Sequence, residues 1–185
     1  VIQDRNEGFL QGVLVSPIPR TSIVLGKVCG GTILAVLQGI LFLVLARAMQ
    51  LIGLTDDMNW NVMLLSLIGM VAFLTLMGFG LVGFGYMFAW RFDSIQGFHS
   101  IMSVLLFPMW LLSGAFFPLT GGGWLTWLMK LNPLTYSVAG LKRVMSADSA
   151  YLAGLPPMWL CVTVSVAFAA VCVLIDVRMT WKHRV

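Results

Sequence analysis

Few side chains in this sequence are spaced as chemistry would require. The run Gly78-Phe79-Gly80-Leu81-Val82-Gly83 has the G-x-G-x-x-G spacing of a dinucleotide-binding loop. Such a loop needs a preceding strand, a solvent-facing helix start and an acidic residue about 20 positions later, whereas this run lies inside 33 uncharged residues. We therefore interpret its glycines as small residues that let helices pack closely. Gly78 and Gly85 share one helical face, and Gly80 and Gly83 share nearly the opposite one.

The other reactive groups lack the neighbours that catalysis or metal binding needs. His99 and His183 are far apart in the sequence, and no carboxylate pair is placed to share a substrate. The three cysteines show no C-x-x-C spacing. Gly26-Lys27 precedes Val28 rather than Ser or Thr and lacks the upstream glycine of a Walker A loop. We predict no catalytic site, no bound cofactor and no metal in this chain.

The composition indicates which elements hold these residues. Of the 185 residues, 59% are hydrophobic and 10% are charged, whereas soluble domains are about 25% charged. Four charge-free runs cover 28–46, 58–90, 94–129 and 149–175. About 20 apolar residues cross a membrane as a helix. We predict an all-α polytopic membrane helix bundle, with domain 28–185 crossing the membrane at about 28–51, 62–88, 98–117 and 158–175.

The positive net charge follows the expected loops. The chain has 11 Lys and Arg against 7 Asp and Glu, a formal net charge of +4. With four crossings, seven basic residues fall on the side of the two ends and four on the other side, which also holds Asp56 and Asp57. The positive-inside rule then places both ends in the cytoplasm. We expect a multi-pass protein of a bacterial-type plasma membrane, surrounded by lipid bilayer and without a nucleic-acid partner.

Residues 1–27 form a segment of different character before the first span. Gln3, Glu7 and Gln11 recur every four residues, beside an apolar stripe of Phe9, Leu10, Val13 and Leu14. This spacing predicts a short amphipathic helix. Ser16-Pro17-Ile18-Pro19 ends it, because proline removes amide donors and disfavours helical angles before it. Arg20 and Lys27 flank the membrane entry. Two interpretations stay open, an interfacial lead-in and a docking surface for a partner.

A second unusual segment follows the third span. Pro108 is expected to kink that span, and Ser113-Gly114 and Pro118 break it near its outer end. Asn132-Pro133 is a typical helix start, with Asn at the N-cap and Pro at N1. We predict an outer re-entrant helical hairpin at about 119–145; an amphipathic surface loop is the alternative. The residues that we assign to this hairpin also include Trp124, Trp127, Tyr136 and Arg143. The last span then leads into a polar tail that starts at Asp176.

The expected spans have no ionisable residue in their central parts. Proton-driven carriers depend on such groups, so we disfavour proton-driven transport and a membrane enzyme. Any energy source must then come from another subunit. A non-transporting assembly protein or a channel remains the alternative class, although a channel would need a polar or charged ring along its pore.

Two separated signatures resemble a known family. The first covers Asp4 to Leu10, then Leu14-Val15-Ser16-Pro17, Arg20 and Gly26-Lys27. The second covers Leu112 to Pro118 and Leu131 to Tyr136, followed by Arg143. Together they resemble the cytoplasmic loop, fifth span and outer hairpin of type-2 ATP-binding-cassette (ABC) exporter permeases. The resemblance implies that the chain corresponds to the part after the second of six spans, a fragment without the family's N-terminal helix and first two spans.

The resemblance also implies a mechanism and partners. Members pair two permease copies with two separate ATPase subunits, which bind ATP and magnesium and act through a short cytoplasmic coupling helix. By this analogy Glu7, Phe9, Leu10, Val13 and Leu14 face the ATPase, with Ser16, Pro17, Arg20 and Lys27 beside them. The hairpin would shape the outer exit.

The daunorubicin-resistance type of this family is the most similar in loop and hairpin. Lipo-oligosaccharide and lipid-linked polysaccharide exporters share the motifs. The 12 Met and 12 Phe residues suit loosely specified apolar ligands, although they are also ordinary lining of membrane helices. We expect a homodimeric permease that exports hydrophobic drug-like or lipid-like molecules.

Overall fold

The computed structural model describes residues 2–8, 12, 19–54, 64–117, 119, 123–146, 152 and 154–182. Within these ranges the regular elements are all helices. Four helical stretches of 21 to 31 residues are long and apolar enough to cross a membrane. At 1.5 Å per residue each is at least about 31 Å long, which matches a hydrocarbon core of about 30 Å. The prediction of an all-α polytopic membrane bundle is confirmed.

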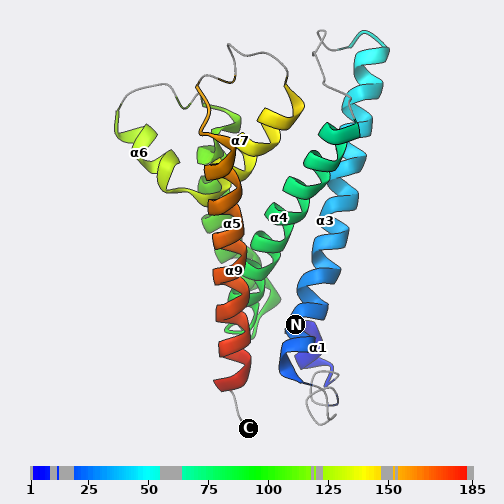
Figure 1. Ribbon diagram of the computed structural model, residues 1–185. Coiled ribbons are helices and arrows are strands. Elements are labelled where there is room, and N and C mark those ends of the chain that lie inside the picture. The colour runs from blue at the N-terminus through cyan, green and yellow to red at the C-terminus, as the bar shows by residue number, and fades with distance from the viewer. Residues whose placement is uncertain are drawn as a thin grey trace.

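The long helices are α3 (Arg20–Leu51), α4 (Leu64–Ala89), α5 (Ile95–Trp110) and α9 (Met158–Lys182). Helix α5 continues into a π-helical turn, η1 (Leu111–Ala115). Three shorter helices, α1 (Ile2–Asn6), α6 (Trp124–Leu131) and α7 (Pro133–Met145), lie at the ends of the bundle. Helix α1, the start of α3 and the end of α9 lie at one end, here called the α1 end, whereas α6 and α7 lie at the other, the hairpin end (Figure 1).

Helix α4 is the centre of the packing, since it contacts α3, α7 and α9. At the α1 end Val24, Val28 and Tyr86 form a buried cluster. Toward the hairpin end Phe73 of α4, Ala139 of α7 and Cys161 of α9 form a second one. Helices α3 and α5 leave many large apolar side chains exposed, as expected of surfaces that meet lipid or other membrane helices.

The first and last long helices, α3 and α9, extend beyond the predicted spans. Helix α3 begins at Arg20, eight residues before the predicted start, and α9 continues to Lys182. A charged residue ends the apolar run from which a span is predicted, but it does not end the helix. The interpretation of Asp176 as part of a polar tail is wrong, because Asp176 lies inside α9 with 0% of its surface exposed.

The N-terminal segment also differs from the prediction. Helix α1 ends at Asn6, and Glu7 follows in a turn. Gly8 has a φ of 75°, a left-handed conformation that glycine adopts readily. Gln3 therefore lies in α1 and Glu7 in the turn that follows it, whereas Gln11 lies outside the described residues.

Candidate coupling site and outer hairpin

Helix α1 is tied to the start of α3 by an ion pair. Lys27 Nζ donates a hydrogen bond to Asp4 Oδ2, and Ile2 of α1 is buried. The bond from Lys27 holds the pKa of the Asp4 carboxyl below its usual value of 3.8. Gln3 Nε2 donates to Glu7 Oε1 at 2.8 Å. Lys27, predicted to flank the membrane entry, therefore anchors the N-terminal segment on α3.

The structure places only part of the predicted coupling segment. Glu7 is exposed just after α1, and Arg20 is the first residue of α3. Phe9, Leu10, Val13, Leu14, Ser16 and Pro17 lie outside the described residues. Their assignment to a partner surface stays a prediction.

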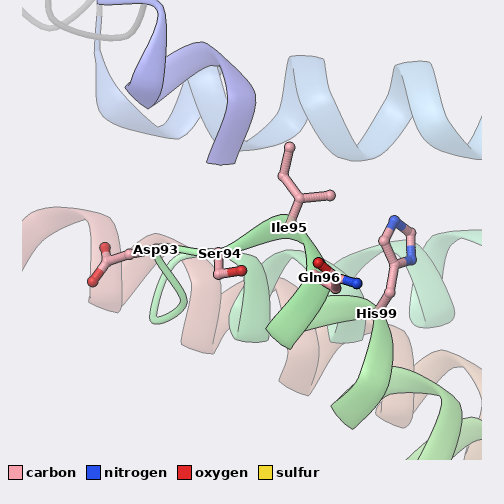
Figure 2. A pocket seen from close by; sticks show the side chains of 5 residues that line it. All are labelled: Asp93, Ser94, Ile95, Gln96 and His99. Atoms are coloured by element: carbon pink, nitrogen blue, oxygen red, sulfur yellow. The ribbon is translucent and has the colours of Figure 1, made fainter.

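The turn between α4 and α5 forms an open hollow at the α1 end. Its lining residues are Asp93, Ser94, Ile95, Gln96 and His99. Ile95 and His99 point toward α1 and α3, whereas Asp93 is turned away from them (Figure 2). Ser94 caps α5, because its Oγ accepts the Gly97 amide hydrogen bond at 3.3 Å. Across the described ranges, no three His, Cys, Asp or Glu side chains gather closely enough to hold a metal ion.

At the hairpin end, Asn132 joins two helices. Its side-chain oxygen accepts a hydrogen bond from the Leu134 amide at 3.1 Å, which caps α7, and Pro133 is at the first helical position. Its Nδ2 donates to the Met109 carbonyl at 2.6 Å. Asn132 therefore starts α7 and also fixes it against the end of α5.

The break after α5 has a specific geometry. The sequence predicted a break at Ser113-Gly114, and this is confirmed, because the non-helical angles are at Gly114, with φ 80° and ψ 8°. Pro108, the predicted kink, lies inside α5. A π-helical turn shifts the usual hydrogen-bond ladder, and side chains take up the nearby carbonyls. Thr135 Oγ1 lies 3.1 Å from the Leu112 oxygen, and Lys142 Nζ donates to the Gly114 oxygen at 2.7 Å. Ser113 Oγ donates to the Trp110 carbonyl at 2.6 Å.

Arg143 fixes the chain that leads into α9. Its guanidinium donates to the carbonyls of Pro156 at 2.6 Å, Leu155 at 2.7 Å and Leu152 at 3.1 Å. Tyr136 donates to the Lys130 carbonyl at 2.9 Å.

The remaining predicted hairpin residues include two exposed tryptophans. Trp124 and Trp127 of α6 are each 77% exposed. Such side chains suit a membrane interface, where aromatic rings gather. Pro118 lies outside the described residues.

The four glycines of α4 that were predicted to allow close packing face three different helices. A Cβ on Gly78 would lie 3.4 Å from Ala35 and Thr32 of α3, and one on Gly85 would lie 3.8 Å from Met102 of α5. On the opposite face, a Cβ on Gly80 would lie 2.7 Å from Phe168. One on Gly83 would lie 3.1 Å from the Cβ of Cys172. Phe168 and Cys172 both belong to α9.

Two residues escaped the sequence analysis. Asp176 was assigned to the polar tail because it follows an uncharged run, although a four- and three-residue spacing of small or polar residues leads to it. These buried residues form one stripe of α9: Cys161, Ser165, Ala169, Cys172, Asp176 and Thr180. Lys142 was not among the predicted hairpin residues, and no sequence signal shows that it would bond to Gly114.

Residues 1–146 match the ABC-2 type transporter membrane family. The matched region holds α1, the first three long helices, α6 and α7. The chain belongs to this family. It is thus a multi-pass permease component of an ABC-type transporter, and members of the family work with an ATP-binding subunit. Comparison with curated proteins and with solved structures gives no significant match.

Proposed function

We propose that this ABC-2 permease is the transmembrane subunit of an ATP-driven exporter that moves hydrophobic drug-like or lipid-like molecules out of the cytoplasm or inner leaflet. The family match over residues 1–146 is the observation that carries this proposal. A separate ATPase subunit binds ATP and magnesium and hydrolyses the nucleotide. A second permease copy completes the pathway.

The ATPase docks at the α1 end, which faces the cytoplasm. The Asp4–Lys27 ion pair supports this assignment, because it links the predicted coupling segment to a membrane helix. A displacement of α1 would therefore be passed to α3 and, through the buried cluster of Val24, Val28 and Tyr86, to α4. Mechanical coupling of this kind requires packed elements that move together.

The hairpin end shapes the outer exit. Helix α6 carries two exposed tryptophans, Trp124 and Trp127, and hydrogen bonds hold α7 to the end of α5 and to the turn that follows it. Apolar, polarizable lining suits a loosely specified apolar cargo better than a charged one. Lipid-linked glycans are the competing cargo, and a substrate scan separates the two classes.

The coupling surface can be tested by replacing Phe9 and Leu10 together with Ala. In vesicles that contain permease and ATPase, we expect the double variant to insert normally but to lose ATP-driven transport. The matched control is Leu51→Ala with Ile52→Ala, two exposed apolar residues at the end of α3, at the other end of the bundle. Unchanged transport in the Phe9 and Leu10 variant would overturn the coupling assignment.

A further inference from the structure

The α1 end contains a carboxyl group sealed inside the bundle. Asp176 is 0% exposed, and both of its carboxyl oxygens are buried without a hydrogen-bond partner among the described residues. It lies six residues before the end of α9, about 9 Å along the helix axis. A buried, unpaired ionisable group inside a membrane helix calls for a functional explanation.

The seal comes from small residues on two facing helices. Helix α9 turns the stripe of Cys161, Ser165, Ala169, Cys172, Asp176 and Thr180 inward, and α4 opposes it with glycines. A Cβ on Gly83 would lie 3.1 Å from the Cβ of Cys172 and 3.4 Å from Asp176 Oδ2. The absence of a side chain at Gly83 therefore lets α9 approach until the carboxyl group has no access to solvent.

The surroundings of Asp176 offer no counter-charge. On α4 the nearby titratable group is Tyr86, whose hydroxyl is also buried. On α9 itself the neighbours are Cys172 and Thr180, and Thr180 Oγ1 donates to the Asp176 backbone carbonyl at 2.7 Å.

The two elements beyond α4 and α9 offer no counter-charge either. Helix α3 contributes the apolar side chains of Val24 and Val28 to the adjoining cluster. Lys27 of α3 is paired with Asp4 of α1. In the described part of the chain, no cationic group pairs with the Asp176 carboxyl.

The ligand of this carboxyl group follows from what the site can supply. An ionised carboxylate is unfavourable in an apolar interior unless it is paired or hydrogen-bonded. A metal cation would need several oxygen ligands, but in the described part of the chain no group of three His, Cys, Asp or Glu side chains gathers to hold one. A proton needs one oxygen and no further ligands. We propose that Asp176 is a proton-binding site within the α4–α9 interface, and that proton release requires α9 to separate from α4 at the α1 end.

Infrared spectroscopy of the full chain in lipid tests this proposal without any transport measurement, so its failure is distinct from failure of the export proposal. At neutral pH we expect a C=O stretching band of a protonated carboxylic acid, and its loss in Asp176→Asn. The control is Asp93→Asn, which removes an exposed carboxyl group at the same end and should leave the band unchanged.

Two results would overturn the proposal: no protonated-acid band in the wild-type chain, or a band that persists in Asp176→Asn. If this variant does not fold, the wild-type chain labelled with ¹³C at the aspartate carboxyl carbons decides. The band must then shift to lower frequency, and an unshifted or absent band contradicts the assignment.

Discussion

Lys142 of α7 donates a hydrogen bond to the backbone carbonyl of Gly114, 28 residues earlier, at 2.7 Å. The two residues join the outer hairpin to the turn at which α5 loses its regular helical geometry. Together with the bonds from Asn132 and Thr135, this contact makes the break after α5 a fixed joint between helices.

Replacing Lys142 with Met should loosen this joint. The variant keeps much of the apolar stem but removes a charged donor to a partly buried carbonyl, and such hydrogen bonds contribute about 1.5–3 kcal/mol. We expect the free energy of unfolding in detergent to fall by about that amount. Lys130→Met, at an exposed position of α6, is the control and should change it by less than about 0.5 kcal/mol. Equal effects of the two variants would contradict the role of Lys142.

Asn132 can be tested by separating its two hydrogen bonds. Asn132→Asp keeps the acceptor that caps α7 but loses the donor to the Met109 carbonyl, whereas Asn132→Ala loses both. An N-cap is worth about 1 kcal/mol, so Asn132→Ala should lower the free energy of unfolding through the lost cap as well as the lost interhelical bond. Circular dichroism during unfolding gives the two values. If Ala were tolerated as well as the wild-type residue, the cap would carry no stability.

Gly140 of α7 is expected to tolerate no larger residue. A Cβ there would lie 2.2 Å from the Phe73 ring, so Gly140→Ala should force α7 away from α4 and cost about 1–3 kcal/mol. Gly30→Ala in α3 is the matched control, because nothing lies within 4 Å of its Cβ position and Ala favours helix. Addition of Phe73→Leu should recover part of the loss. A harmless Gly140→Ala would show that α4 and α7 do not pack this closely.

The Asp4–Lys27 pair predicts a pH dependence with a definite sign. Since the pKa of Asp4 is lowered in the folded chain, the pair contributes stability above the usual value of 3.8 and loses it as the pH falls through the lowered pKa. Because both side chains are partly exposed, the contribution should stay below about 1 kcal/mol. The attachment of α1 to α3 should therefore be constant near neutral pH.

A charge exchange tests the same pair. Asp4→Lys alone should free α1 from α3, and Asp4→Lys combined with Lys27→Asp should restore the contact. A spin label at each helix would report the distance between α1 and α3. If the double variant stays as separated as the single one, the ion pair does not hold α1.

Composition and spacing predicted the bundle well because each span contains a long run without charges. The start of α7 was also readable, since Asn132-Pro133 satisfies a local capping rule that does not depend on the rest of the fold. The break of the third span at Ser113-Gly114 was also predicted, and the non-helical angles are at Gly114. Its form as a π-helical turn was not predicted, because Gly114 adopts its angle beside partners from a distant segment. Asp176 was misplaced for a similar reason. Its burial depends on Gly83 of another helix, and no single helix reveals that contact.

The measurement that tests the central claim most directly is ATP hydrolysis by the permease reconstituted in lipid with an ATP-binding subunit, scanned against apolar drugs and lipid-linked glycans. We predict a stable complex whose ATPase rate rises with apolar drug-like or lipid-like compounds, and loses that response in the Phe9→Ala and Leu10→Ala double variant. Stimulation by glycans alone would contradict the proposed cargo. A chain that binds no ATPase, with no compound altering hydrolysis, would contradict the exporter itself.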